Sequence, residues 1–436
     1  MKNTNRSRPG YKKTKVGWIP EEWELQKLGS LINCYSGGTP NRGNPDYWGG
    51  NIPWVKSGEL NQKNIYVAGE NISELGVSNS SACYVEPNTL LYALYGATAG
   101  VPAFCRIHAT INQAILAIQT NGILDNSFLY FWFIFHRKRL IGHYTQGGQP
   151  NLSAAIVKSF ECVSPSLPEQ KKIAEILSTW DEAIGQLRKL IDAKKRCKKA
   201  LMQQLLTGKK RLLGLGSEKH KVPLKEKGKK IDPNKWEQVK IKDIFKRVVR
   251  KVGEAKDIEA LSITATVGFV RQRDKFSKVI AGKQFKNYIL LRRGEFAYNK
   301  GNSKSYPQGC IYRLEYYQEA AVPHVFYCFK ALSDKVVPGF YAQYFSHGML
   351  NHHLARLINS GVRNDGLLNL SAEAFFNIPI CIPSVEEQSL IAEMLQTADN
   401  EINLLNDELI VLKKQKRGLM QKLLTGTIRV KNTEEI

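Results

Sequence analysis

The sequence lacks the long apolar runs that a membrane span requires, and its cysteines lack metal-binding or redox spacing. No window approaches ~18 uninterrupted apolar residues, and residues 1–25 are basic and polar, without the apolar stretch of a secretion signal. The eight cysteines lie at least 18 residues apart, which favours reduced, buried thiols over zinc ligands or disulfides. We therefore expect a cytoplasmic protein with no membrane partner and no metal site.

Nucleotide-binding and catalytic motifs are also scarce. The sequence contains no Gly-x-x-x-x-Gly-Lys-Ser/Thr phosphate loop, no Gly-x-Ser-x-Gly elbow and no His-Glu-x-x-His helix. Residues 44–47 (NPDY) lack the second proline of the adenine clamp of amino-methyltransferases, and residues 254–256 (EAK) match only the end of a nuclease site. The sequence accordingly predicts no catalytic residues and no cofactor bound by this chain.

Acidic residues are few relative to basic ones. The 436 residues include 39 Asp and Glu against 63 Lys and Arg, a net charge of +24. Residues 1–218 carry 27 basic and 16 acidic residues (+11), and residues 219–436 carry 36 and 23 (+13). The excess is therefore shared by both halves, which favours a polyanionic partner such as a nucleic acid.

One segment of the sequence occurs twice. Residues 167–208 and 385–426 align without a gap, 218 residues apart, with 19 of 42 positions identical. Each copy follows a Pro-Ser pair, contains Glu-Gln and Ile-Ala-Glu, and ends in Leu-Leu-Thr-Gly. Because 218 is half of 436, the chain is predicted to be an internal duplication.

Each copy is predicted to be one long helix, about 60 Å in length. Capping boxes are expected at Ser166/Glu169 and Ser384/Glu387, and C-cap glycines at Gly208 and Gly426. Apolar residues alternate at steps of four and three, the spacing of a coiled coil, with lysines 194, 198 and 416 as interruptions. The predicted seam comprises Ile173, Leu177, Trp180, Ile184, Leu187, Ile191, Leu201 and Leu205, and Ile391, Leu395, Ile402, Leu405, Leu409, Leu412, Leu419 and Leu423.

A narrow apolar seam must be covered by another helix, and the duplicate is the nearest candidate. We favour an antiparallel pair within one chain, because it places one globular segment at each end and relates them by a pseudo-twofold axis. A parallel pair and a coiled coil that dimerises in trans are the alternatives.

The predicted fold is mixed α+β, with two α/β domains separated by an intramolecular antiparallel coiled coil and related by internal duplication. The predicted segments are domain 1 (1–160), the first spacer helix (166–208), a basic linker (209–232), domain 2 (233–380), the second spacer helix (384–426) and a C-terminal tail (427–436).

This arrangement resembles the specificity (S) subunit of type I restriction-modification systems, which defend cells against foreign DNA. Residues 36–40 (SGGTP), 47–50 (YWGG) and 52–60 (IPWVKSGEL) are similar to one common class of its target recognition domains. The resemblance implies a non-catalytic subunit that binds double-stranded DNA. It also implies two methyltransferase (M) subunits that bring S-adenosylmethionine, and restriction/translocase (R) subunits that bring ATP and Mg.

Two unlike domains on one scaffold predict a bipartite, gapped DNA target, with the helices setting the gap. Basic side chains would contact phosphates and polar loop residues would read base edges, with Glu59 a possible acceptor from cytosine N4. We expect Lys300→Ala or Lys304→Ala to weaken DNA binding broadly and to flatten its salt dependence. The candidate DNA-binding residues are Thr39, Asn41, Arg42, Lys56, Ser57, Glu59, Asn299, Lys300, Asn302, Ser303, Lys304 and Tyr306.

Two other classes of function stay open from the sequence. One is a stand-alone nuclease or methyltransferase fused to recognition domains, and the other is a basic coiled-coil adaptor for nucleic acid. Incubating the purified chain with DNA, magnesium and S-adenosylmethionine, with and without a methyltransferase partner, separates these alternatives from the specificity subunit.

Overall fold

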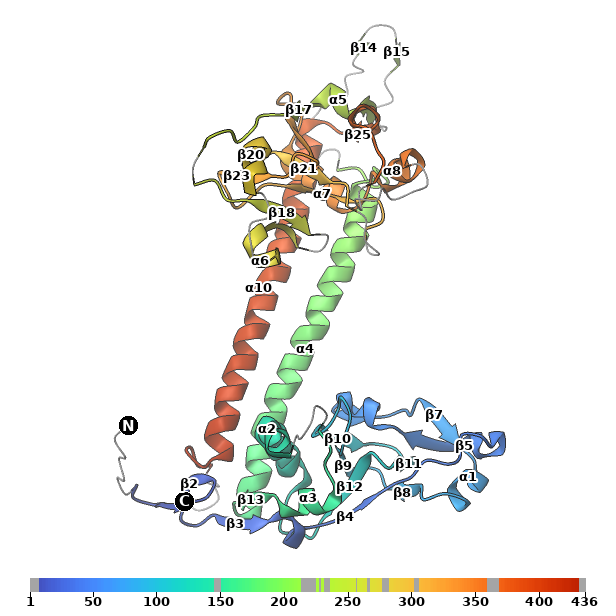
Figure 1. Ribbon diagram of the computed structural model, residues 1–436, viewed down its shortest axis with the longest axis vertical. Coiled ribbons are helices and arrows are strands. Elements are labelled where there is room, and N and C mark those ends of the chain that lie inside the picture. The colour runs from blue at the N-terminus through green and yellow to red at the C-terminus, as the bar shows by residue number, and fades with distance from the viewer. Residues whose placement is uncertain are drawn as a thin grey trace. The chain divides into compact units, whose positions relative to one another are not determined.

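The computed structural model of the chain describes residues 8–144, 150–212, 225–226, 229–230, 236–255, 257–264, 267–276, 282–301, 306–358 and 368–430 (Figure 1). It forms two compact units. Unit 1 comprises Met1–Arg188 and Asp407–Ile436, and unit 2 comprises Lys189–Asn406. Each unit contains one α/β domain and a segment of each of the two long helices, α4 (Leu167–Leu205) and α10 (Val385–Leu424).

The domain of unit 1 contains two main sheets with mixed strand directions. The five-stranded sheet has the order β4 (Ile32–Ser36), β12 (Ile115–Thr120), β9 (Leu90–Ala93), β10 (Pro102–Cys105) and β6 (Asn64–Ile65). The four-stranded sheet has the order β7 (Glu70–Ile72), β5 (Trp48–Val55), β11 (Ala109–Ile111) and β8 (Cys83–Val85). The pairs β10–β6 and β11–β5 are parallel, and the other pairs are antiparallel.

Shorter elements complete unit 1. The strand pairs are β1 (Tyr11–Thr14) with β2 (Gly17–Pro20), and β3 (Glu24–Lys27) with β13 (Glu161–Ser164). The helices are η1 (Leu28–Ser30), η2 (Pro45–Tyr47), η3 (Ser57–Asn61), α1 (Glu74–Ser78), α2 (Asn126–Tyr144) and α3 (Ala154–Ser159).

The core of unit 1 forms where α2 packs on the five-stranded sheet. Phe131 and Phe133 are completely buried, and Phe133 stacks on Tyr92 of β9 with 4.3 Å between ring centroids. The aromatic run 130–133 is therefore part of the core of unit 1. Ile173 of α4 and Leu423 of α10 belong to the same cluster, which ties both long helices to this domain.

The domain of unit 2 is built around a four-stranded antiparallel sheet. Its order is β17 (Phe245–Val248), β24 (Tyr327–Ala331), β21 (Phe296–Asn299) and β22 (Cys310–Arg313). Further pairs are β16 (Glu237–Lys240) with β25 (Pro379–Ile382), β18 (Leu261–Thr264) with β19 (Gly268–Arg271), β20 (Ile289–Arg292) with β23 (Glu319–Val322), and β14 (Lys225–Glu226) with β15 (Lys229–Lys230). The helices are α5 (Ile241–Ile244), α6 (Gln272–Phe276), η4 (Gly282–Asn287), α7 (Pro338–Ser346), α8 (Asn351–Leu357) and α9 (Ala372–Phe376).

The core of unit 2 is rich in phenylalanine. Phe245, Phe296 and Phe329 are buried and pack on one another with ring centroids 5.3–5.7 Å apart. Leu205 of α4 and Leu395 of α10 belong to the same cluster. Both domains are therefore packed onto both long helices by apolar contacts within their own unit.

The long helices are antiparallel neighbours in each unit. In unit 1, Asp181 of α4 forms an ion pair with Lys416, near the end of α10. In unit 2, Lys198, near the end of α4, forms an ion pair with Asp399 in the first half of α10. Early residues of one helix thus lie beside late residues of the other, and the predicted antiparallel pairing within one chain is confirmed (Figure 1).

Most of the predicted seam is removed from solvent. The buried members are Ile173, Leu177, Ile184, Leu187, Ile191, Leu205, Ile391, Leu395, Ile402 and Leu423. The half-buried members are Trp180, Leu201, Leu405, Leu409, Leu412 and Leu419.

Both long helices end two to three residues before the predicted glycines. Gly208 and Gly426 have φ values of 68° and 69°, the left-handed conformation that a C-terminal cap requires. Each glycine also lies close to the domain of its own unit. A Cβ atom at Gly208 would lie 3.3 Å from Trp236, and one at Gly426 would lie 2.4 Å from Pro20. Glycine therefore both closes the helix and allows the chain to turn against the domain.

Part of the predicted linker (209–232) and of the tail (427–436) lies outside the described residues. No helix among the described residues is long and apolar enough to cross a membrane.

Candidate DNA interface, helix-end anchors and a cationic pocket

In the first domain the structure brings two predicted DNA-binding cations together around one carboxylate. The guanidinium of Arg42 lies 3.7 Å from the ring centroid of Trp48 and 2.7 Å from Glu70. The amine of Lys56 is paired with the same carboxylate. Hydrogen bonds from Lys56 and Arg42 lower the pKa of Glu70 against the opposing effect of desolvation. The result is a fixed, net positive and half-exposed cluster on a tryptophan face.

The Gly37-Gly38 segment before this cluster lies close against the sheet. A Cβ atom at Gly37 would lie 1.8 Å from the carbonyl oxygen of Ile111, and one at Gly38 would lie 2.1 Å from Oγ of Ser81. The indole N–H of Trp54 also donates to the Gly38 carbonyl at 3.0 Å. The glycines are needed for this close approach, which sets the position of the following Thr-Pro-Asn-Arg segment.

The other first-domain candidates have local partners. Thr39 is hydrogen-bonded to Gln113, and the Asn41 side chain accepts from the backbone N–H of Gly43. Glu59 accepts from the backbone N–H groups of Lys56 (2.8 Å) and Gly69 (2.6 Å). Both oxygens of Glu59 therefore hold the turn. Ser57 begins the η3 turn and is half-buried.

Sequence reasoning missed two residues beside this turn. Tyr66 and Val67 are 65% and 79% exposed, and their loop ends at Gly69, which Glu59 holds. Exposed apolar side chains next to a cationic cluster are suited to contacts with thymine methyl groups or sugars. The signal available in the sequence was an apolar pair within an otherwise polar segment.

In the second domain the candidates have more varied positions. Asn299 donates to the carbonyl of Ile263 at 3.2 Å and accepts from the N–H of Gly301. Lys300 is only 9% exposed, and its amine donates to the hydroxyl of Tyr327 at 3.3 Å. This placement favours a packing role for Lys300 over a phosphate contact.

The remaining second-domain candidates include three that lie outside the described residues: Asn302, Ser303 and Lys304. Tyr306 is hydrogen-bonded to Tyr312. Sequence reasoning also missed Tyr316 and Val267, which are 93% and 73% exposed and line one pocket of about 290 Å³ in unit 2.

The glutamate of each repeated Glu-Gln pair anchors the opposite repeat. Glu169 accepts hydrogen bonds from Nε (2.8 Å) and a terminal nitrogen (3.0 Å) of Arg429. It also accepts one from the indole N–H of Trp23 (3.1 Å). Its side chain is 4% exposed. In unit 1 a bidentate ion pair, with a buried carboxylate and a partly exposed arginine, therefore joins the start of α4 to the residues that follow α10.

Unit 2 contains the equivalent network. Glu387 accepts hydrogen bonds from two nitrogens of Arg211, each at 2.9 Å. It also accepts hydrogen bonds from the indole N–H of Trp236 at 3.0 Å and the backbone N–H of Leu212 at 3.1 Å. Burial alone would raise the pKa of Glu387, but the hydrogen bonds from Arg211, Leu212 and Trp236 outweigh it and lower the pKa.

Of the two predicted capping boxes, only the serine half of the Ser384/Glu387 box is formed among the described residues. Ser384 caps α10 by accepting from the N–H of Glu387 at 3.2 Å. The glutamate carboxylate does not return to the N-cap, because it binds the arginine and tryptophan instead. Both arginines stand three residues beyond the Leu-Leu-Thr-Gly glycine. An arginine at the same distance after each repeat was the sequence signal for these ion pairs. Arg211, which falls in the predicted linker, therefore has a structural role.

The glutamines that follow Glu169 and Glu387 also make equivalent hydrogen bonds. Gln170 donates to the carbonyls of Ile123 and Pro165, each at 2.9 Å, and Gln388 donates to those of Lys335 and Pro383 at the same distance. Each Glu-Gln pair thus joins its helix start to the adjoining domain.

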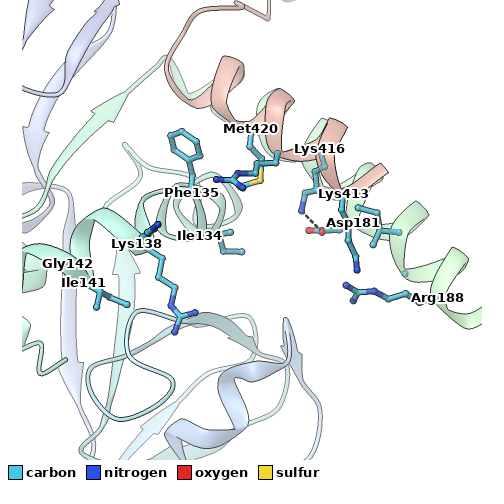
Figure 2. A pocket seen from close by; sticks show the side chains of 14 residues that line it. Ile134, Phe135, Lys138, Ile141, Gly142, Asp181, Arg188, Lys413, Lys416 and Met420 are labelled. Carbon is cyan, nitrogen blue, oxygen red and sulfur yellow. Dashed lines mark hydrogen bonds and ion pairs between the residues drawn. The ribbon is translucent and has the colours of Figure 1, made fainter. Parts of the chain in front are cut away.

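A pocket of about 900 Å³ lies between α2, α4 and α10 in unit 1 (Figure 2). Apolar side chains line part of it, including Ile134, Phe135, Ile184 and Met420. Gly185 also lines it, and a Cβ atom there would meet nothing within 4 Å. Glycine within a helix costs roughly 1 kcal/mol relative to alanine, and no contact within the described chain requires it. The position leaves room for the close approach of another molecule.

The rim of this pocket is strongly cationic. None of Lys138, Arg188, Lys413 and Arg417 forms an ion pair with another described residue. The single acid among the described lining residues, Asp181, is already paired with Lys416 (Figure 2). The pocket therefore suits a partner that presents apolar side chains together with negative charge.

Among the described residues, no group of three or more His, Cys, Asp or Glu side chains could hold a metal ion.

Comparison with known proteins identifies the family of the chain. The family model of the type I restriction modification DNA specificity domain matches residues 20–194 and 233–414. The chain belongs to this family. Type I specificity proteins from Methanocaldococcus jannaschii are similar over nearly the whole length. The MjaIX specificity subunit is 28% identical over 438 residues, covering 96% of both chains, and the MjaVIII specificity subunit is 24% identical over 426 residues, covering 95% of both.

Solved specificity-subunit structures share the fold. The S subunit of a type I restriction-modification system from M. genitalium aligns with a TM-score of 0.53 and 15% identity, covering 92% of this chain and 96% of that one. A chain from a structure describing complex assembly of the type I R-M system aligns with the same TM-score and 12% identity, covering 94% and 99%. The mixed α/β architecture with two domains and two long helices is thus that of the family.

Proposed function

We propose that this chain is the DNA-recognition subunit of a type I restriction-modification complex and directs adenine methylation and cleavage by partner subunits. The observation that carries this proposal is the match of both halves to the DNA specificity domain. The net charge of +24 supports a polyanionic partner. The chain contributes recognition and its partners contribute catalysis. A cytoplasmic location, where DNA is accessible, is part of the proposal.

Each domain would read one half of a bipartite, gapped DNA target. The repeated anchors give the domains equivalent attachments, whereas their candidate DNA-binding loops have different residues. Because the two domains are attached in the same way but have different candidate loops, we expect two different half-sites rather than a palindrome. In the first domain, Arg42 and Lys56 supply fixed positive charge beside the exposed pair Tyr66 and Val67.

The direct test is methylome sequencing of the source cell before and after deletion of the gene. We expect one asymmetric, gapped, adenine-methylated motif to disappear on deletion. In vitro, methylation should require a methyltransferase partner together with this chain, DNA and S-adenosylmethionine. Methylation or DNA cleavage by the purified chain alone would contradict the proposal and favour a fused enzyme. Binding without preference for any duplex sequence would favour a nucleic-acid adaptor.

The cationic pocket of unit 1 is the candidate docking site for a methyltransferase subunit. We propose that an amphipathic helix of this partner, with apolar residues on one face and acidic residues beside it, occupies the pocket. The support is charge complementarity with four cations that form no ion pair with another described residue, together with the space that Gly185 leaves on α4. Two methyltransferase subunits and the translocase/nuclease subunits complete the proposed assembly.

Reversing three rim charges tests this docking site. We expect Arg188→Glu, Lys413→Glu and Arg417→Glu together to reduce co-purification with the methyltransferase. Lys246→Glu and Lys330→Glu are a suitable control, because these exposed lysines lie on β17 and β24 of unit 2. Equal co-purification of both variants with the partner would reject the pocket as the docking site.

A further inference from the structure

Two ion pairs interrupt the apolar seam between the long helices. Lys416 is 12% exposed and is paired with Asp181 in unit 1. Lys198 is 16% exposed, and its amine lies 2.6 Å from both carboxylate oxygens of Asp399 in unit 2. These lysines are two of the three residues that interrupt the predicted heptad pattern, and each has an acidic partner on the opposite helix.

The two pairs are copies of each other. Asp181 and Asp399 occupy the same position of the repeat, as do Lys198 and Lys416. The aspartate of each copy pairs with the lysine of the other copy. The same number of residues separates Asp181 from Lys198 along α4 as separates Asp399 from Lys416 along α10. Both pairs therefore belong to one antiparallel register.

A parallel arrangement would bring like charges together. If the two copies lay side by side in the same direction, Lys198 would lie beside Lys416 and Asp181 beside Asp399. Burying like charges next to each other is strongly unfavourable, because neither keeps its solvation or gains a counter-ion. The charged positions therefore discriminate against the parallel pair, which the apolar residues alone would allow.

A shift by one heptad would also break the pairs. It would keep the apolar residues in contact but would place Lys416 opposite Ala174 or Arg188 instead of Asp181. Desolvation already lowers the pKa of Lys416, and Asp181 opposes that effect. Without the aspartate, a buried ammonium would have no counter-ion. A polar residue in an otherwise apolar seam is a known means of specifying register at a cost in stability.

We propose that the Asp181–Lys416 and Lys198–Asp399 pairs select the antiparallel direction and the register of α4 and α10. The apolar seam supplies the association, and the ion pairs determine which of several apolar alignments forms. This assignment rests on the two units as described and does not depend on the proposed function, so either can fail without the other.

A neighbouring ion pair provides a reporter of the register. Lys194 of α4 lies 2.6 Å from Glu401 of α10. A carbodiimide joins an amine to a carboxylate only where the two are in contact, so peptide mapping should find Lys194 coupled to Glu401 in the full-length chain. A one-heptad shift would bring Glu408 to this position instead. Lys172 and Glu175, 2.9 Å apart within α4, provide an internal control for coupling in every sample.

The test removes both seam pairs at once. We expect the variant Asp181→Leu, Lys198→Leu, Asp399→Leu, Lys416→Leu to lose Glu401 as the main coupling site of Lys194 and to gain Glu408 or intermolecular products. The exchanged variant Asp181→Lys, Lys198→Asp, Asp399→Lys, Lys416→Asp should couple at Glu401 again. Retention of Glu401 as the main site in the leucine variant, with Lys172–Glu175 coupling unchanged, would overturn the proposal.

A second comparison applies if the leucine variant does not fold by circular dichroism. Lys198→Asp with Lys416→Asp places two aspartates at each pair, and the exchanged variant restores opposite charges with the same residue types. Recovery of the Lys194–Glu401 product only in the exchanged variant supports the proposal. Equal loss in both variants, or equal retention in both, contradicts it. The matched control is Arg292→Ala with Glu319→Ala, which removes an exposed ion pair away from the helices.

Discussion

In unit 1 the carboxylate of Glu169 binds Trp23 and Arg429, and in unit 2 that of Glu387 binds Trp236 and Arg211. The candidate DNA-binding surfaces show no such agreement. The first domain presents a cation cluster around Glu70, whereas the second buries Lys300 against Tyr327. The repeated sequence therefore specifies how each domain is attached to the long helices. The two domains differ in the residues that are candidates for DNA binding.

The largest effect is expected from breaking one anchor. Replacing Glu387 by Ala leaves Arg211 without its buried counter-ion and should destabilise unit 2 by about 3–5 kcal/mol. Glu169→Ala should also destabilise unit 1, but by less, because Arg429 is 32% exposed and keeps Glu22 as an acidic partner. Hydrogen-exchange mass spectrometry resolves the two units, and each substitution should increase exchange mainly in its own unit.

The control for the anchors is an exposed ion pair. Lys15 and Glu161 lie 3.3 Å apart with the lysine 83% exposed, and replacing both by Ala should change stability by less than about 1 kcal/mol. If Glu387→Ala changed stability as little as this control does, the Glu387 anchor would not stabilise unit 2, and the proposed equivalence of the two anchors would be contradicted.

The pH dependence of the anchor sharpens the comparison. The folded-state pKa of Glu387 lies below its usual value of 4.5. Its ionised form therefore contributes stability that is present above the unfolded-state pKa and is lost as the pH falls through the folded-state pKa. Urea unfolding between pH 6 and pH 3 should show a decrease in stability that is weaker in Glu387→Gln. The same pH slope in both proteins would assign the decrease to other carboxylates.

A smaller effect is expected on DNA binding by the first domain. Arg42→Ala removes the cation stacked on Trp48 and should weaken binding of the methylated motif by about 1–3 kcal/mol. Arg42→Lys keeps the charge but loses the planar stacking, so it should recover only part of the loss. Fluorescence anisotropy with DNA altered in one half-site at a time tests both variants. The weakening should depend on one half-site only, and equal dependence on both would contradict a first-domain contact.

The smallest effect is expected at Lys300. Lys300→Met keeps the apolar stem but loses the hydrogen bond to Tyr327, which should cost about 1 kcal/mol of stability. Because the amine is buried, we expect the salt dependence of DNA binding to stay unchanged. A slope reduced by about one in a log–log plot would instead restore Lys300 as a phosphate contact. Lys304→Ala tests the neighbouring candidate in the same assay.

The long helices could be predicted from the sequence because heptad spacing is a local pattern. Their antiparallel direction could be predicted because each repeat follows its own globular segment. The same repetition contained the aspartate partners of Lys198 and Lys416. Those partners lie on the other helix, however, so spacing within one helix could not reveal them. The carboxylate of Glu169 was assigned to a local cap because its true partner, Arg429, is distant in sequence.

The candidate DNA-binding residues were predicted less completely. The glycine turn indicated where the first-domain loop lies, and Arg42 and Lys56 do come together there. No pattern in the sequence indicates that Glu59 accepts hydrogen bonds from two backbone N–H groups or that Lys300 is buried. Both outcomes depend on contacts with segments that fold back from elsewhere in the chain.

The division of the chain also has a consequence for synthesis on the ribosome. Unit 2 is one continuous stretch, 189–406, whereas unit 1 combines residues 1–188 with residues from 407 onward. The later domain can therefore finish folding while the earlier one still waits for Arg429 to neutralise Glu169. During that interval Glu169 lacks its arginine and the first domain exposes the apolar surface that α10 will cover, so this part of the nascent protein is expected to need protection by a chaperone.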